Sequence, residues 1–357
     1  MNYGDSHLNN EIASMIDPQA PSFIALQKLL DLEADCLSKA LIQARADDGY
    51  TRYEFPKGNG QVRVINAPAE ELKLCQRKLL DDILSQISVT PFAHGFVPHR
   101  SIITNALIHA PSARSIFNLD LKDAFPSVSE QSVYRIIQWR VGEFLKVNTP
   151  QLSSAERNEI YQMITRLCTR DGALPQGAPT SGYLLNLACA RLDRLVYAAA
   201  LKSRLPQIKY TRYADDLTIS SSAPIPPEFI AQVKRAVVRS GFQVHPHKVH
   251  CYNDHQKAIV ICGIRIHNRG LALPKASLKR YRAQLNDFAH KNHTEITEQE
   301  KAKILGVISF LRSIYPAPPS MIVKPLNAFL QQHSSWVNAP KLKSASSFKH
   351  FSYNPEV

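Results

Sequence analysis

Several features that mark fibrous, membrane and secreted proteins are scarce or absent in this sequence. Glycine contributes only 13 of 357 residues and follows no repeat, which excludes a collagen-like or low-complexity chain. No apolar run reaches the roughly 18 residues of a membrane-spanning helix, and the start of the chain has no signal-peptide pattern. The six cysteines include no CxxC pair, which argues against a zinc knuckle or a disulfide framework. We therefore expect a soluble, cytoplasmic protein.

Acidic residues are also fewer than basic ones. Lys and Arg number 43 against 30 Asp and Glu, a formal net charge of +13. A surplus of this size predicts a polyanionic partner, although total charge alone does not separate a nucleic acid from a membrane surface. Hydrophobic residues make up 44% of the chain, which is ordinary for a protein with a buried core.

The hydrophobic pattern predicts a mixture of helices and strands. Apolar residues alternate on both sides of the Gly58-Asn59-Gly60 turn, which predicts a hairpin. A second hairpin is expected with Ala214-Asp215-Asp216 at its tip. Thr297 and Glu300 have the spacing of a capping box at a helix start. The other expected elements are helices at 70–87, 228–240, 275–291, 298–313 and about 319–332, and single strands at 114–119 and 258–266.

Three carboxylates occupy positions from which they could act together. Asp120 ends the apolar strand, and Asp215 and Asp216 lie in the second hairpin. Carboxylates that converge at strand ends can hold two Mg²⁺ ions, because hard cations prefer oxygen ligands. Two such ions activate the attacking oxygen and stabilise the leaving oxygen in phosphoryl transfer. The alternative is a solvated turn, since Asp is common in turns.

These carboxylates belong to three motifs that occur in a fixed order. Residues 120–128 read DLKDAFPSV, residues 174–181 read LPQGAPTS, and residues 213–216 read YADD. Together they resemble motifs A, B and C of reverse transcriptases. The resemblance implies an α+β right-hand polymerase fold with fingers, a palm built on an antiparallel sheet packed by helices, and a helical thumb. It divides the chain into an N-terminal helical extension (1–49), fingers and palm (50–274), thumb (275–335) and a basic C-terminal tail (336–357).

The resemblance also assigns catalytic roles, residue by residue. Asp120, Asp215 and Asp216 match the metal-binding triad, and the backbone carbonyl of Leu121 matches a further ligand. Two Mg²⁺ ions are implied, with Mn²⁺ as a substitute. Phe125 matches the steric gate that excludes ribonucleotides, whereas the alternative role is a core aromatic beneath the sheet.

Four more positions match residues that contact the nucleotide. Gln176 and Gly177 match residues beside the incoming nucleotide and template, where glycine permits close backbone contact; an ordinary helix-entry loop is the alternative. Arg63 matches the arginine that clamps the triphosphate, a role suited to bidentate contacts, against an exposed strand arginine. Lys248 has the spacing of the motif D lysine, a general acid toward pyrophosphate.

Further features resemble the retron branch of bacterial reverse transcriptases. Motif B reads QGAPTS, and residues 105–109 read NALIH, which matches the retron NAxxH signature. Asn105 and His109 lie at i, i+4 on one helix face and could hydrogen-bond RNA, or could pack the helix against its neighbours. A second retron signature, Val-Thr-Gly, is replaced by Ile261-Cys262-Gly263, in which a thiol stands for the hydroxyl.

The predicted helix 275–291 carries a basic face. Lys275, Lys279 and Arg282 fall at i, i+4 and i+7, and Leu278 and Leu285 fall on another face. One face would pack while the other meets an RNA phosphate backbone; a solvated charged face is the alternative.

The implied function is an RNA-directed DNA polymerase of a retron. It would copy part of its own structured non-coding RNA, which serves as template and primer, into branched RNA-linked single-stranded DNA (msDNA) from dNTPs. Retrons act in antiphage defence, which implies a separate effector protein and no membrane partner. The alternatives are another bacterial reverse transcriptase, of the group II intron or abortive-infection type, or a non-catalytic RNA-binding scaffold. The sequence does not identify the cognate RNA, the effector or the oligomeric state.

Overall fold

The computed structural model describes residues 16–56, 60, 62–110, 114–253, 259–267, 270–291, 296–315, 322 and 326–328. The chain forms two compact units: unit 1 comprises residues 1–100 and 114–253, and unit 2 comprises residues 101–113 and 254–357. Helix α5 (Ile102–His109) and three short strands belong to unit 2, and the predicted division into fingers, palm and thumb stays a prediction. None of the described helices is long and apolar enough to cross a membrane.

Unit 1 begins with two helices that contribute to its main core. Leu26 and Leu37 are fully buried there, so the described part of the predicted N-terminal helical extension contributes to the core of this unit. The predicted hairpin follows as two antiparallel strands. The helix predicted at 70–87 becomes a π-helical turn after Lys78 and ends as a 3₁₀ turn. The elements are α2 (Pro21–Leu29), α3 (Ala34–Gln43), η1 (Asp47–Gly49), β1 (Tyr50–Pro56), β2 (Val62–Pro68), α4 (Glu70–Lys78), η2 (Leu79–Ile83) and η3 (Leu84–Gln86).

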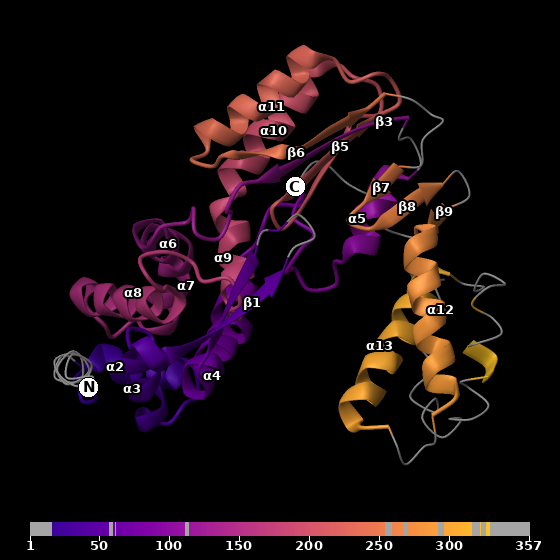
Figure 1. The fold of residues 1–357 in the computed structure, drawn as a ribbon. Coiled ribbons are helices and arrows are strands. Elements are labelled where there is room, and N and C mark those ends of the chain that lie inside the picture. The colour runs from indigo at the N-terminus through magenta and orange to yellow at the C-terminus, as the bar shows by residue number, and fades with distance from the viewer. Residues whose placement is uncertain are drawn as a thin grey trace. The chain divides into compact units, whose positions relative to one another are not determined.

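A four-stranded antiparallel sheet forms the centre of unit 1, in the order β4-β5-β3-β6. The strand predicted at 114–119 is β3, an interior strand, and the second predicted hairpin is β4–β5. Helices α10 and α11 run along one face of this sheet (Figure 1). The elements are β3 (Ser115–Leu121), α6 (Glu130–Ile136), η4 (Ile137–Val141), α7 (Gly142–Asn148), α8 (Ser154–Cys168), α9 (Ser181–Ala188), α10 (Ala190–Ser203), β4 (Lys209–Tyr213), β5 (Asp216–Ser221), α11 (Pro227–Arg239) and β6 (Val244–Tyr252).

Unit 2 joins α5 to a small sheet and two helices, which share a second core. The single strand predicted at 258–266 is wrong: the chain reverses at Cys262 and Gly263, whose φ angles are +47° and +79°. The capping box is confirmed, because the Glu300 N–H donates to Thr297 Oγ1 over 3.2 Å. Most of the helix predicted at 319–332, and the tail at 336–357, lie outside the described residues. The elements are β7 (Ile259–Ile261), β8 (Ile264–His267), β9 (Gly270–Ala272), α12 (Lys275–Ala289) and α13 (Glu298–Ile314).

Candidate active site

Two strand ends bring the three predicted carboxylates to one edge of the four-stranded sheet. Asp120 on β3 and Asp216 on β5 are directly opposed in the antiparallel register, and directly opposed side chains lie on the same face. Asp215 lies in the two-residue turn between β4 and β5, next to Ala214, whose φ is +56°. The Leu121 N–H donates to the Asp215 carbonyl over 2.9 Å, which ties the turn to the end of β3.

The electrostatic surroundings of Asp215 differ from those of an ordinary surface carboxylate. Burial, and next the negative charge of Asp120, raise the pKa of Asp215, whereas Lys248 and Arg63 lower this pKa. Lys248 Nζ donates to Asp120 Oδ2 over 2.5 Å. Two carboxylates that repel each other in a partly buried site favour a cation near both of them. The donor chemistry of this edge therefore fits a divalent ion.

The carboxylates are gathered at this edge, but they are not arranged as a complete ligand set. Among the described residues, no three His, Cys, Asp or Glu side chains are placed to hold one metal ion. Asp120 is bonded by Lys248, and Asp216 also has an interaction of its own. Mg²⁺ usually keeps waters and takes substrate phosphate oxygens beside one or two carboxylates. The two-ion site with Leu121 as a backbone ligand stays a prediction.

An irregular pairing between β3 and β6 places Lys248 next to Asp120. The register between β3 and β6 shifts between Leu119 and Leu121, and β6 has extra residues there. Pro246 lies in this bulge, where the backbone of β6 does not pair with β3. Its lack of an N–H therefore costs no hydrogen bond of the sheet. The Lys248 side chain is half exposed, so it reaches Asp120 from the solvent side of the site.

The loop with Gln176 and Gly177 lies against strand β2. The Asn66 N–H donates to the Gln176 carbonyl over 2.7 Å. Gly177 has a φ of +125°, and a Cβ at this position would lie 2.7 Å from the Asn66 carbonyl oxygen. Glycine is therefore required here by the approach of β2, whereas the sequence analysis related it to the approach of a nucleotide. Arg63 lies exposed on this same strand.

Phe125 is half buried and contacts an aromatic ring that the sequence analysis did not single out as a site residue. Its ring meets Phe96 edge to face, with centroids 6.3 Å apart. Phe96 is 54% exposed and has a φ of +57°. The Phe96 ring lies over Gly182, where a Cβ would collide with it. Both proposed roles of Phe125 fit this position, since the ring packs on one side and remains accessible.

A buried polar network lies directly behind the turn at Asp215. The guanidinium of Arg212 donates to both carboxylate oxygens of Asp193, each over 2.8 Å, and both side chains are fully buried. Arg212 Nη1 also donates to the Ala214 carbonyl over 2.9 Å, so the network holds the turn itself. Asn186 accepts from the same nitrogen and donates to the Gly95 carbonyl. Neither Arg212 nor Asp193 was predicted as a site residue. In the sequence, each stands out only as a charged residue within a segment expected to form a strand or a helix.

The arrangement of these motifs agrees with comparison against known proteins. The family model "Reverse transcriptase (RNA-dependent DNA polymerase)" matches residues 55–309. The chain belongs to the reverse transcriptase family. The predicted α+β right-hand polymerase fold is thereby confirmed.

Related reverse transcriptases indicate the branch. The chain is 33% identical to the Retron Mx162 reverse transcriptase and 34% identical to the Retron Mx65 reverse transcriptase, both of Myxococcus xanthus, over 82% and 75% of its length. It spans 64% and 62% of those two proteins. It is 30% identical to the Retron Ec86 reverse transcriptase of Escherichia coli, over 75% of this chain and 78% of that protein. The predicted retron type is confirmed.

One solved structure extends the comparison at low similarity. A telomerase from Candida albicans, in complex with a fragment of telomeric RNA, is 14% identical to this chain, with a TM-score of 0.41. The match covers 81% of this chain and 60% of the telomerase. A similarity this low has no bearing on function.

The RNA-binding residues predicted for this reverse transcriptase all lie in unit 2. The side chains of Asn105 and His109 are fully buried, and Asn105 Nδ2 donates to Cys262 Sγ over 3.4 Å. This burial agrees with the packing alternative for the pair, and the hydrogen bonds to RNA stay a prediction. The two retron-like segments meet each other. By contrast, the basic face of α12 is exposed, with its three predicted members Lys275, Lys279 and Arg282.

Proposed function

We propose that this chain is an RNA-directed DNA polymerase that copies part of a dedicated non-coding RNA into DNA. The observation that carries the proposal is the direct pairing of Asp120 with Asp216, beside Asp215, in a chain related to retron reverse transcriptases. The substrates are an RNA template with its primer and the four dNTPs.

Catalysis is proposed at the carboxylate edge. Asp120, Asp215, Asp216 and the Leu121 carbonyl would hold two Mg²⁺ ions, which Mn²⁺ could replace. Bound ions of this kind activate the attacking hydroxyl and stabilise the leaving oxygen. Lys248 protonates the departing pyrophosphate, a role that requires its ammonium to leave Asp120 for the phosphate.

The surrounding residues are proposed to orient the nucleotide. Arg63 lies exposed on β2, and its positive charge already acts on Asp215, which supports a role in binding the triphosphate. Gln176 is positioned by the hydrogen bond between its carbonyl and β2, with Gly177 allowing that approach. Phe125 lies beside the 2′ position of the incoming sugar, supported from one side by Phe96.

The retron type suggests the nature of the RNA and the product. Priming from an internal guanosine 2′-OH would give branched, RNA-linked single-stranded DNA. The exposed cations of α12 contact the RNA phosphates, while Asn105 and His109 keep α5 packed in unit 2. A role in antiphage defence, with a separate effector protein, is part of the same proposal.

The experiment is to purify the protein with its native nucleic acid and sequence what it carries. We expect one defined RNA with covalently attached single-stranded DNA, released by debranching enzyme. The Asp216→Asn variant, expressed in the same way, should carry the RNA without the DNA. Heterogeneous RNA with no branched DNA would contradict the retron proposal and leave a general reverse transcriptase. An absence of DNA synthesis by the unaltered protein on any primed RNA would contradict the polymerase itself.

A further inference from the structure

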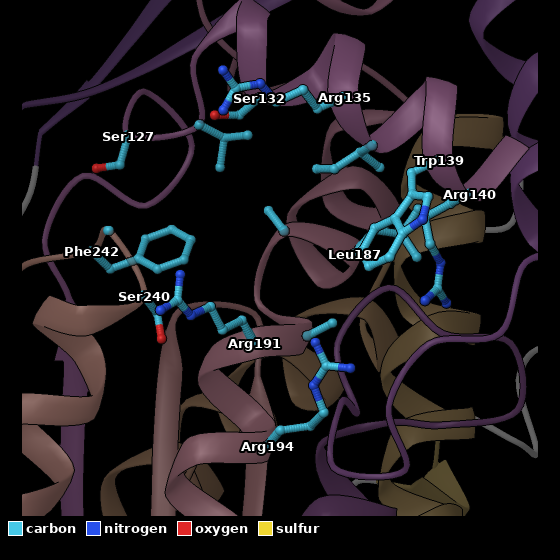
Figure 2. A pocket seen from close by; sticks show the side chains of 15 residues that line it. Ser127, Ser132, Arg135, Trp139, Arg140, Leu187, Arg191, Arg194, Ser240 and Phe242 are labelled. Carbon is cyan, nitrogen blue, oxygen red and sulfur yellow. The ribbon is translucent and has the colours of Figure 1, made fainter. Parts of the chain in front are cut away.

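A hollow of about 300 Å³ opens on unit 1 and contains none of the three carboxylates. Its walls come from Ser127 and Val128 in the loop after β3, from α6 with the π-helical turn η4, from the junction of α9 and α10, and from the turn after α11 (Figure 2). Leu187 and Phe242 are buried in its floor. We call it the arginine pocket, because four of its lining residues are arginines and none of its described lining residues is acidic: Arg135, Arg140, Arg191 and Arg194.

The arginines of this pocket are available for an anionic ligand. All four side chains are exposed. Arg140 donates to the Ser88 carbonyl over 2.7 Å, and within the described chain none of the four has a carboxylate partner. The acidic residues nearest in sequence are already engaged, since Asp193 binds Arg212 and Glu143 binds Lys146. Guanidinium groups bind phosphate oxygens in bidentate geometry and are weakly hydrated, which suits a phosphodiester ligand.

An aromatic side chain stands at the rim of the same pocket. Trp139 is 79% exposed, and it is carried by the π-helical turn η4 (Figure 2). Such turns are rare and occur often at functional sites. An exposed indole beside several arginines can stack a nucleobase while the arginines hold its phosphates. Trp139 is the one large exposed hydrophobic side chain among the described lining residues, which is little apolar surface for a protein interface.

We propose that the arginine pocket binds a single-stranded segment of RNA, with phosphates on Arg135, Arg191 and Arg194 and one base stacked on Trp139. Duplex RNA does not meet these requirements, because its bases are stacked on each other and its major groove is too narrow for side chains. The proposal extends the proposed function, in which a dedicated RNA is the partner, by adding a contact surface that lies outside the polymerase site.

The two tryptophans of the chain allow a direct test. In a Trp336→Phe background, Trp139 is the sole tryptophan, so its fluorescence reports on the pocket alone. The probes are a 12-nucleotide oligo(U), a blunt RNA hairpin and dATP. Oligo(U) should quench the fluorescence. The Kd of every variant is measured by fluorescence anisotropy of dye-labelled oligo(U), and Trp139→Ala should raise this Kd about 5- to 150-fold, as expected for loss of one base stack. Trp139→Phe should keep most of the affinity.

The charge requirement has a matched control. Arg191→Gln with Arg194→Gln should weaken oligo(U) binding and lower the salt slope by about 1.4, or 0.7 for each lost contact. Lys202→Gln with Arg235→Gln removes the same charge from exposed positions of α10 and α11 outside the pocket, and should change neither. Equal effects of the two double variants, or equal quenching by the hairpin, would overturn the proposal. So would displacement of oligo(U) by dATP, which would assign the pocket to a free nucleotide.

These outcomes are separable from those of the proposed function. The pocket variants keep all residues of the carboxylate edge, so extension of a DNA primer on a long poly(A) template should stay near the unaltered rate at saturating template. Loss of oligo(U) binding with retained extension is the expected combination. Unchanged oligo(U) binding in every pocket variant would refute the pocket even if the protein carries a branched RNA–DNA product.

Discussion

Charged side chains are buried behind the turn at Asp215 but exposed on the basic face of α12. Behind the turn, Arg212 and Asp193 are fully buried and hydrogen-bonded to each other and to the backbone of the turn. On α12, Lys275, Lys279 and Arg282 are exposed. The difference fits the two proposed roles, since phosphoryl transfer requires fixed geometry whereas binding a phosphate backbone requires mainly positive potential.

The pair of Arg212 and Asp193 shows why buried charges are costly to folding. Burial alone would lower the pKa of the Arg212 guanidinium, but Asp193, with smaller contributions from Cys189 and Tyr210, outweighs burial and raises it. The Arg212 guanidinium therefore stays charged inside the protein. Removing one partner would leave the other as an unpaired buried charge, whereas an exposed cation can be removed with little effect on folding.

The largest effect is expected from the carboxylate edge. Asp120→Asn should lower DNA synthesis at least a thousandfold, because it removes the charge of a proposed metal ligand, whose contribution is several kcal/mol. Extension of a DNA primer on an RNA template measures this loss. The control is Asp171→Asn, an exposed aspartate with a φ of +50°, a conformation that Asn tolerates. Comparable activity of the Asp120 variant and this control would contradict the assignment.

The next largest effect is expected on stability, from the buried pair of Arg212 and Asp193 behind the turn. Asp193→Asn should lower the free energy of unfolding by about 3–5 kcal/mol, the usual cost of breaking a buried ion pair. Urea unfolding followed by circular dichroism measures it. Glu143→Gln breaks the exposed pair with Lys146 and should leave the unfolding midpoint unchanged. If the two variants unfold alike, the network does not support the turn as described.

Much of this site was predictable from local sequence. The three motifs identified the carboxylates, and the period of the apolar residues predicted β3, the two hairpins of unit 1 and helix α12. The network was not predictable, because Arg212 and Asp193 come from a strand and a helix that meet only in the folded unit. The turn at Cys262 was missed because it lies within an apolar run that reads as one strand.

The burial of Asn105 also depends on contacts between segments that are distant in the sequence. Helical spacing places Asn105 and His109 on one face, but spacing alone does not say whether that face is covered. In the structure β7, β8 and β9 lie against α5, so the covered face is the one that carries this pair.

A smaller effect is expected at Phe125. Phe125→Val should raise incorporation of ribonucleotides relative to deoxyribonucleotides at least tenfold, because it opens space beside the 2′ position. Competition between labelled dNTP and rNTP on one template measures the ratio. Phe96→Val removes the neighbouring ring but not the proposed gate, and should shift the ratio less. If the two variants give equal ratios, Phe125 acts as a packing residue.

The smallest effect is expected on α12. Lys279→Gln or Arg282→Gln should each reduce the salt slope of RNA binding by about 0.7–0.9, the value for one phosphate contact, without changing the unfolding midpoint. Fluorescence anisotropy with labelled RNA at several salt concentrations measures the slope. Asn286→Gln, at another exposed position of α12, is the matched neutral control. An unchanged slope in both cation variants would leave this face as solvated surface.

The surroundings of Asp215 are costly to folding, and we propose that this cost serves catalysis. The raised pKa of Asp215 means that its ionised form destabilises the folded state, a cost absent below the unfolded pKa near 3.8 and fully present above the folded pKa. The most direct measurement compares thermal unfolding in EDTA at pH 7 with primer extension in Mg²⁺, for Asp215→Asn and the unaltered protein. We expect Asp215→Asn to unfold at a higher temperature than the unaltered protein and to lack DNA synthesis. A variant that unfolds at a lower temperature, or that still extends primers, would contradict this proposal.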